Sequence, residues 1–126
     1  MKLQGKVALV TGAGRGLGGT IAQALAREGA KLVVCDIDHG ALQDTRAALA
    51  LQGAECLALD CDVSDRGAVD DLFAQAAACF GSVDVLVNNA ARVPSSVAET
   101  ARRNRHYAHA TTPVPRQSLG IVSSLS

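Results

Sequence analysis

The residues with the clearest chemical purpose form a glycine cluster that directly follows a short apolar run near the N-terminus. The sequence from Val7 to Gly19 reads VALVTGAGRGLGG, and the residues after it have the periodic apolar pattern of an amphipathic helix. Glycines permit a tight turn and a close approach of phosphates, and a helix N-terminus offers unpaired N–H groups and a positive dipole end. This arrangement predicts a binding site for a pyrophosphate group.

The glycines fit two spacing patterns. Gly12, Gly16 and Gly18 form G-x-x-x-G-x-G, whereas Gly14, Gly16 and Gly19 form G-x-G-x-x-G. Either pattern alone is a weak signal, and the alternative is a glycine-rich turn that only packs a helix against a strand. The position of the cluster, immediately after a strand and before a helix, favours phosphate binding.

Asp36 is a second candidate, because it ends an apolar run 20 residues after Gly16. A carboxylate there can accept hydrogen bonds from ribose hydroxyls and repel a 2′-phosphate, which favours NAD over NADP. Arg15 supports the opposite preference, since a guanidinium can bind a phosphate through two hydrogen bonds. Residue 37 is Ile, however, and offers a phosphate no positive charge. The sequence therefore predicts NAD as the cofactor.

Three other groups of polar residues could suggest a metal or a nucleic-acid site. They are Asp60, Asp62 and Asp65; His106 and His109; and Arg102, Arg103 and Arg105. We expect the carboxylates to have separate roles, one pointing outward, one at the sheet edge and one near a helix N-terminus. No helical pattern or carboxylate fixes the two histidines, and no aromatic platform accompanies the arginines. An ordinary basic loop without metal or nucleic acid is therefore favoured.

Four apolar strands alternating with three helices must position these candidates. The strands are predicted to begin near Val7, Lys31, Glu55 and Val83. Their apolar runs are continuous, as in parallel strands that are covered on both faces. We therefore predict an α/β fold, an incomplete Rossmann-like doubly wound parallel sheet with strand order 3-2-1-4. In such a fold the last of these strands would be an open, apolar edge, which would make the chain sticky or only marginally stable.

Apolar stripes mark the three predicted helices. The stripes are Leu17, Ile21, Ala24 and Leu25; Leu42, Ala48 and Leu49; and Val69, Leu72, Phe73, Ala76 and Phe80. Gly29, Gly53 and Gly81 follow the helix ends, and Ser64 or Asp65 is the expected N-cap of the third helix.

The composition changes near Ala91, where we place a boundary. Residues 1–91 carry seven basic and eleven acidic residues, whereas residues 92–126 carry five arginines, one acid and all three prolines. Residues 1–91 are predicted to be an NAD-binding half-domain, and residues 92–126 an irregular basic loop or tail that leads toward a missing catalytic half. Within that tail, residues 119–126 are interpreted as the lead-in to a further helix.

The four cysteines and the N-terminus indicate a cytoplasmic protein. The cysteines show no C-x-x-C pair and stand in apolar patterns, which is typical of buried free thiols in a reducing compartment. The continuous apolar stretch near the N-terminus is too short for a signal peptide, and no stretch is long enough to span a membrane.

Four blocks of this sequence together resemble the short-chain dehydrogenase/reductase family. They are TGAGRGLG at 11–18, Asp36, Asp62-Val63, and NNAA at 88–91, where the family more often ends in Gly. The resemblance covers residues 4–91 and implies hydride transfer between a nicotinamide cofactor and a small-molecule alcohol or carbonyl substrate. The cofactor-binding residues would be Gly12, Arg15, Gly16, Leu17, Gly18, Asp36, Ile37, Asp62, Val63, Asn88, Asn89 and Ala90.

The resemblance assigns parts of the cofactor to these blocks. The glycine block would line the pyrophosphate, and Asp36 would hold the adenosine ribose. Asp62 and Val63 would contact the adenine. The residues 88–90 would lie beside the central ribose and help to fix the fourth strand to the first.

The family's catalytic Y-x-x-x-K motif has no counterpart here. Tyr107 is followed four residues later by Thr111, and the lysines all lie within the first 31 residues. The family's serine could be sought in Ser123 or Ser124, since GIVSS at 120–124 loosely resembles the family's fifth strand. The helix expected before that strand is missing and the spacing differs, so no catalytic residue is assigned. We expect the chain to be the cofactor-binding part of a dehydrogenase, inactive alone and forming a homo-oligomer only with the missing half.

The alternative is a non-catalytic module that binds or senses NAD(H), with the basic tail as its contact surface. A methyltransferase with a related glycine loop is disfavoured by the block at 88–91 and by Arg15.

Overall fold

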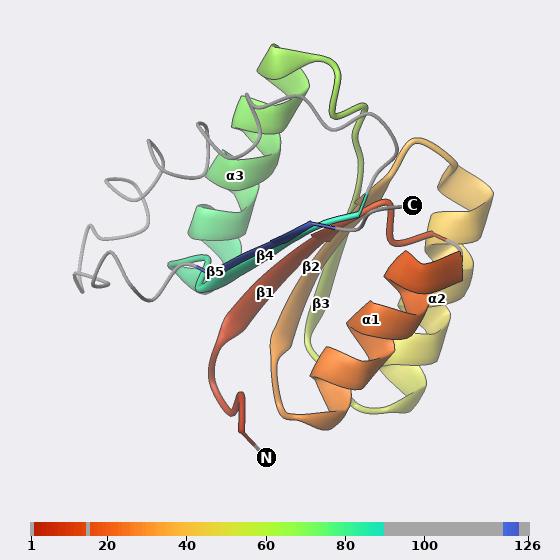
Figure 1. Ribbon diagram of the computed structural model, residues 1–126, viewed down its shortest axis with the longest axis vertical. Helices are drawn as coiled ribbons and strands as arrows, with labels where there is room; N and C mark the ends of the chain where they lie inside the picture. Colours follow the sequence, from red (N-terminus) through yellow and green to blue (C-terminus); the bar gives the residue numbers. More distant parts are fainter. Residues whose placement is uncertain (1, 15, 90–119, 124–126) are drawn as a thin grey trace.

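The computed structural model describes residues 2–14, 16–89 and 120–123 as one five-stranded parallel sheet with helices on both faces (Figure 1). The strand order is β3-β2-β1-β4-β5. The elements are β1 (Val7–Thr11), α1 (Gly16–Arg27), β2 (Lys31–Asp36), α2 (His39–Leu51), β3 (Cys56–Asp60), α3 (Arg66–Phe80), β4 (Val85–Asn88) and β5 (Gly120–Ser123). The predicted α/β fold and the order 3-2-1-4 are confirmed.

The two faces of the sheet each bury an aliphatic core, because successive side chains of a strand point to opposite faces. Val7 and Leu9 of β1 join the core on the side of α3, while Ala8 and Val10 join the core on the side of α1 and α2. All residues of β1 are buried, which explains why its sequence is continuously apolar. Figure 1 shows α1 and α2 on one face and α3 on the other.

The first helix packs differently from its predicted stripe. Leu17 is 53% exposed and Ala24 is also exposed, whereas Gly18, Gly19 and Ala22 are the buried residues of α1. Small residues on this face let the helix axis approach the sheet more closely than leucine would allow. The second helix buries Thr45 together with Leu42 and Leu49, and the third helix buries the predicted stripe from Val69 to Ala76.

Aspartates begin the second and third helices. The Asp38 carboxylate accepts a hydrogen bond from the N–H of Ala41, and the Asp65 carboxylate accepts one from the N–H of Ala68. Each satisfies an N–H group that has no partner within the helix. Of the two N-caps expected for α3, Asp65 is the observed one, and Gly81 ends that helix as predicted.

The interpretation of residues 119–126 as the lead-in to a helix is wrong where the structure describes them. Gly120–Ser123 form β5, which pairs with β4 in parallel, so that Ser123 stands opposite Asn88. The expectation that the fourth strand is an open edge is therefore also wrong. The short apolar pattern at 120–123 did not decide between strand and helix, because the strand's partner lies 35 residues earlier in the chain, as in the pair Val85 and Gly120.

The cysteines are all free, and two of them are buried. Cys35 and Cys61 lie in the core, Cys56 is partly buried, and Cys79 is exposed. Burial was therefore predicted wrongly for Cys79, which lies on the outer side of α3. No helix among residues 2–14 and 16–89 is long and apolar enough to cross a membrane.

A buried carboxylate closes the amino end of the sheet. Asp84 is 7% exposed, and its Oδ2 accepts a hydrogen bond of 2.9 Å from the N–H of Val7. Its own N–H donates to the carbonyl of Val7 at 2.8 Å. Asp84 therefore sets the register between β1 and the residues that enter β4.

We expect replacement of Asp84 by Ala to lower the free energy of unfolding by about 1–3 kcal/mol, because the buried N–H of Val7 loses its acceptor. Urea denaturation measures this loss. Asp84→Asn retains an acceptor oxygen and should cost less, and Asp44→Ala on the exposed side of α2 is the control. Equal losses for Asp84→Ala and Asp44→Ala would contradict the role given to Asp84.

Candidate functional site

The glycine-rich turn joins the carboxyl end of β1 to α1 and forms the centre of the candidate site. Gly12 and Gly16 have φ angles of 61° and 60°, which lie in the left-handed region that favours glycine. Residue 15 lies outside the described residues, so the prediction for Arg15 is not tested there. The turn directs the first residues of α1, with their unpaired N–H groups, toward the carboxyl edge of the sheet.

Gly18 fixes how closely α1 approaches this turn. A Cβ atom on Gly18 would collide with the carbonyl oxygen of Gly12 and would lie 2.6 Å from Nδ2 of Asn89. Only a residue without a side chain fits this position. Gly18 therefore has a packing role in addition to its predicted place along the pyrophosphate.

Asp36 reaches the turn from the carboxyl end of β2. Its Oδ2 accepts a hydrogen bond of 2.8 Å from the N–H of Gly14, and its Oδ1 accepts one of 2.9 Å from the N–H of Asp38. A Cβ atom on Gly14 would lie only 2.7 Å from Oδ2 of Asp36. Two backbone N–H groups thus hold the carboxylate in place, while its remaining lone pairs can accept hydrogen bonds from a ligand.

The second helix supports the turn from the other side through Thr45. Its hydroxyl donates a 2.7 Å hydrogen bond to the carbonyl of Ala13, and the carbonyl of Gly14 lies 3.3 Å from the same oxygen. Thr45 is 5% exposed. A Cβ atom on Gly19 would lie 3.3 Å from its hydroxyl oxygen, so Gly19 leaves room for it. Sequence reasoning missed Thr45, although a polar residue between Leu42 and Leu49 on the apolar face was a usable signal.

The fourth strand contributes Asn88 and Asn89. The backbone N–H of Asn89 donates to Oγ1 of Thr11 at 3.0 Å, and Thr11 Oγ1 lies 3.3 Å from Oδ1 of Asn88. The side-chain amide of Asn89 donates to the carbonyl of Gly12 at 3.3 Å. These contacts connect β4 to the end of β1 and to the turn. Ala90 lies outside the described residues.

One buried acceptor at this site has no partner among the described residues. Oδ1 of Asn89 is inaccessible to solvent and accepts no hydrogen bond from the part of the chain that the structure describes. An unpaired buried oxygen is energetically unfavourable and suits a ligand that carries a hydroxyl or N–H group. Because the Asn89 side chain also contacts the carbonyl of Gly12, this oxygen lies beside the glycine-rich turn and fits the binding of a dinucleotide there.

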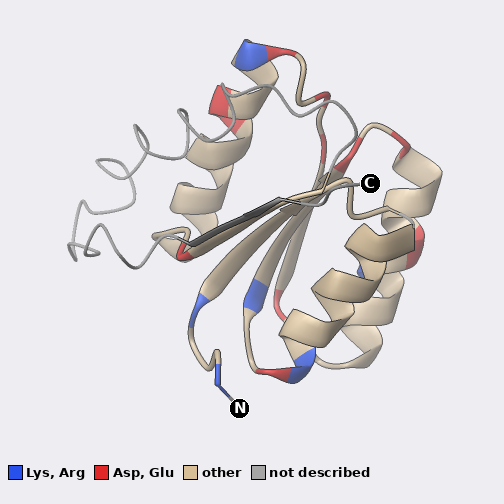
Figure 2. Ribbon diagram, viewed as in Figure 1, with Lys and Arg blue, Asp and Glu red and all other residues tan. Residues whose placement is uncertain are grey.

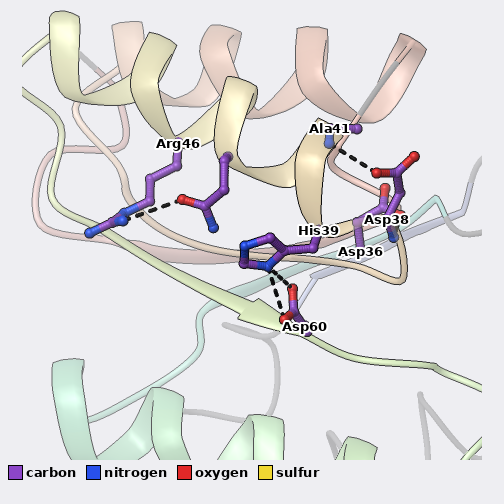
Figure 3. A network of polar contacts seen from close by, with 7 residues as sticks. Asp36, Asp38, His39, Ala41, Arg46 and Asp60 are labelled. Atoms are coloured by element: carbon purple, nitrogen blue, oxygen red, sulfur yellow. Dashed lines mark hydrogen bonds and ion pairs between the residues drawn. The ribbon is translucent and has the colours of Figure 1, made fainter.

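Acidic residues surround the site at the ends of β2 and β3 (Figure 2). Asp60, the last residue of β3, accepts hydrogen bonds of 2.9 and 3.0 Å from Nδ1 of His39 in the first turn of α2. Figure 3 shows that this pair bridges α2 and β3 beside Asp36 and Asp38. Both members are exposed, so solvent screens their interaction and its contribution to stability is small.

The next two site candidates lie after β3. Asp62 is exposed, and hydrogen bonds from the hydroxyl and the N–H of Ser64 lower the pKa of its carboxyl. Val63 is buried in the core on the side of α3. Ile37 and Leu17, by contrast, are exposed, and Ile37 is the more exposed at 73%. The three aspartates 60, 62 and 65 thus have separate local partners, as expected.

Most residues that were compared with the family's catalytic motif, or weighed as metal or nucleic-acid ligands, lie outside the described residues. Tyr107, Thr111, the two histidines at 106 and 109 and the arginines at 102, 103 and 105 lie outside the described residues. Of the serines considered, Ser123 stands in register with Asn88 at the carboxyl end of β5, and Ser124 lies outside the described residues.

Comparison with known proteins agrees with this geometry. The model of the short chain dehydrogenase family matches residues 6–111. The chain belongs to the short-chain dehydrogenase family. The match extends beyond the 4–91 range on which the sequence resemblance rests.

Two relatives are named as dehydrogenases of polyols. A sorbitol dehydrogenase from Cereibacter sphaeroides is 43% identical over 91 residues, which are 72% of this chain and 34% of that protein. A galactitol 2-dehydrogenase from Agrobacterium fabrum is 44% identical over 91 residues, which again cover 72% of this chain and 34% of the relative. The chain therefore spans about a third of the length of these curated relatives.

Two solved structures contain different nicotinamide cofactors. A short-chain dehydrogenase/reductase from Burkholderia phymatum in complex with NAD matches with a TM-score of 0.69 and 43% identity, covering 71% of this chain and 32% of that one. A metagenomic short-chain oxidoreductase in complex with NADP matches with a TM-score of 0.68 and 38% identity, covering 71% and 41%. Structural neighbours thus bind NAD or NADP.

Replacing Gly18 by Ala tests the close packing at the turn. We expect the free energy of unfolding to fall by about 1–3 kcal/mol, because the new methyl group overlaps the Gly12 carbonyl. The control is Gly40→Ala on α2, where a Cβ atom would lie 3.6 Å from its nearest neighbour, Oδ1 of Asp38. That change should leave stability equal or raise it by up to about 1 kcal/mol. Similar urea midpoints for the two variants would contradict the packing role.

Proposed function

We propose that this chain supplies the NAD-binding part of an oxidoreductase that transfers a hydride between nicotinamide and an alcohol or carbonyl substrate. The observation that carries the proposal is the Asp36 carboxylate, which the N–H of Gly14 holds at the edge of the glycine-rich turn. A carboxylate in this place can accept hydrogen bonds from both ribose hydroxyls of an adenosine. Membership of the short-chain dehydrogenase family supports the assignment.

The proposed cofactor contacts follow the order of the elements. The N–H groups from Gly16 to Gly18 would face the pyrophosphate, with Arg15 and the exposed Leu17 beside them. Asp36 and Ile37 would hold the adenosine ribose, and Asp62 and Val63 would lie on the adenine side. Asn88, Asn89 and Ala90 would lie near the central ribose. A bound nicotinamide would supply the hydride acceptor or donor.

The acidic surroundings favour NAD over NADP. Asp36, Asp38 and Asp60 all lie at the carboxyl ends of β2 and β3 or in the turn that follows. A 2′-phosphate would bring further negative charge next to them, and charges a few ångströms apart near a protein surface interact by several kcal/mol. The imidazole of His39 is already paired with Asp60. Discrimination against NADP therefore follows from repulsion as well as from the hydrogen bonds of Asp36.

The substrate class follows from the relatives and stays a proposal. Sorbitol and galactitol dehydrogenases make polyols the first alcohols to test.

The described cysteines are all free, which supports a reducing compartment such as the cytoplasm. We further propose that residues 1–91 and 92–126 have separate roles, in cofactor binding and in the connection to a catalytic half, and that a complete enzyme forms homo-oligomers.

Calorimetric titration of the chain with NAD and NADP tests the role of Asp36. We expect Asp36→Ala to weaken NAD binding by about 10-fold or more, since each hydrogen bond to a charged group contributes about 1.5–3 kcal/mol. The preference for NAD over NADP should shrink in the same variant. Asp44→Ala is the control, because its exposed carboxylate lies on α2 outside the site. Equal NAD affinity of the unaltered chain and Asp36→Ala would overturn the assignment.

The oxidoreductase proposal needs a second measurement. The intact mass of the protein isolated from its natural source shows whether residues follow Ser126. If the native protein is longer, we expect it to reduce NAD with a polyol as hydride donor. The absorbance of the reduced nicotinamide measures this turnover. A native protein of only 126 residues that binds NAD without any such turnover would overturn the enzymatic part of the proposal and leave the binding part intact.

A further inference from the structure

Two buried thiols lie at the carboxyl ends of neighbouring strands, directly beneath the proposed adenosine site. Cys35 precedes Asp36 in β2, and Cys61 follows the last residue of β3 and precedes Asp62. Cys35 is 0% and Cys61 is 7% exposed. Both belong to the core between the sheet and α3.

The strand pairing brings the two thiols together. Cys35 stands opposite Leu59 in the parallel pair β2–β3, and Cys61 lies two residues beyond Leu59, on the same face. The N–H of Cys61 donates a 3.2 Å hydrogen bond to the carbonyl of Asp36, which draws the chain after β3 toward β2. The side chains of Cys35 and Cys61 therefore lie in the same part of the core and interact through their thiols.

The environment makes the two thiols unequal. The hydrogen bond to Cys61, followed by burial, raises the pKa of the Cys35 thiol well above its usual value. The same hydrogen bond lowers the pKa of Cys61, against the opposing effects of desolvation and of nearby carboxylates. Both pKa shifts favour Cys61 as the attacking thiol, and Cys61 is also the one of the two with some exposure to solvent. Thiolates, not thiols, are the reactive form.

We propose that Cys35 and Cys61 form an oxidisable pair, a modification site that hydrogen peroxide converts to a disulfide beneath the adenosine end of the cofactor site. In the first step the sulfur of Cys61 attacks a peroxide oxygen. The O–O bond breaks, Cys61 becomes a sulfenic acid and one water leaves. In the second step the sulfur of Cys35 attacks the sulfenic sulfur, the S–O bond breaks, and the hydroxyl leaves as water with the proton of Cys35. The thiols lose two electrons and the peroxide gains them.

Disulfide formation would alter the residues that hold the ligand. A disulfide bond is about 2.05 Å long, shorter than any hydrogen-bonded sulfur pair, so the ends of β2 and β3 must shift toward each other. Asp36 and Asp62 are bonded to these cysteines in the chain and would move with them. The expected consequence is weaker dinucleotide binding in the oxidised protein, and this consequence rests on the proposed function.

The other two cysteines serve as comparison groups. Burial raises the pKa of Cys56 to about 11, and Cys56 begins β3 at the opposite end of the strand. Cys79 is exposed on α3. Neither adjoins Asp36 or Asp62 in the chain. The Cys56→Ala/Cys79→Ala double variant therefore removes side reactions and keeps the pair.

The experiment treats this double variant with hydrogen peroxide and measures intact mass and linked peptides. We expect a loss of two hydrogen atoms in mass, a peptide joining Cys35 to Cys61, and reversal by dithiothreitol. Adding Cys35→Ala should instead leave a sulfenic acid on Cys61 that dimedone labels, whereas adding Cys61→Ala should leave Cys35 unreacted. A double variant that keeps both thiols, or gains oxygen without a cross-link, would overturn the proposal.

Calorimetry with NAD on the reduced and oxidised double variant separates this inference from the proposed function. We expect the oxidised form to bind NAD about 10-fold more weakly, within the usual range of coupling between sites. Circular dichroism shows whether the oxidised form stays folded. Absence of NAD binding in the reduced form would contradict the proposed function. The mass measurement would still test whether the disulfide forms. A disulfide with unchanged NAD affinity would refute the coupling.

Discussion

The close approach of α1 to the end of β1 is the constraint on which the rest of the structure depends. Gly18 lies against the Gly12 carbonyl so closely that a single methyl group would not fit. This contact sets the position of the first turn of α1 and therefore the direction of its unpaired N–H groups. The same contact explains why the buried face of α1 consists of Gly18, Gly19 and Ala22 instead of large apolar residues.

The turn is held from three neighbouring elements, and this connects the sheet order to the site. Asp36 reaches it from β2, Thr45 from α2 and Asn89 from the end of β4. Each side chain satisfies a backbone group of the turn that has no partner within a strand or helix. The strand order β2-β1-β4 places Asp36 and Asn89 on opposite sides of the turn. Fold and site therefore depend on the same hydrogen bonds.

The sequence predicted the features that depend on local pattern, and it missed those that depend on contacts distant in the chain. Continuous apolar runs identified β1 to β4, and Asp65 and Gly81 marked the ends of α3. Thr45 was missed because its partner, the carbonyl of Ala13, lies 32 residues away. The exposure of Leu17 could not be read from periodicity, since glycines form the packed side of α1. Strand β5 was misjudged because its short pattern was outweighed by its spacing in the sequence, and its pairing with β4 involves residues 35 positions earlier.

The negative charges of this site repel the phosphates of the proposed ligand, so charge opposes binding. Asp36, Asp38 and Asp60 place negative charge at the carboxyl ends of β2 and β3, although the proposed ligand carries phosphates (Figure 3). Binding energy must then come from short-range groups: helix N–H donors, the anchored carboxylate of Asp36 and the unpaired oxygen of Asn89. Under the proposed function, long-range charge would contribute selectivity, because it would penalise an additional phosphate on the ribose more than the shared pyrophosphate farther along the turn. A site built in this way would recognise a dinucleotide by geometry and disfavour its 2′-phosphorylated form by charge.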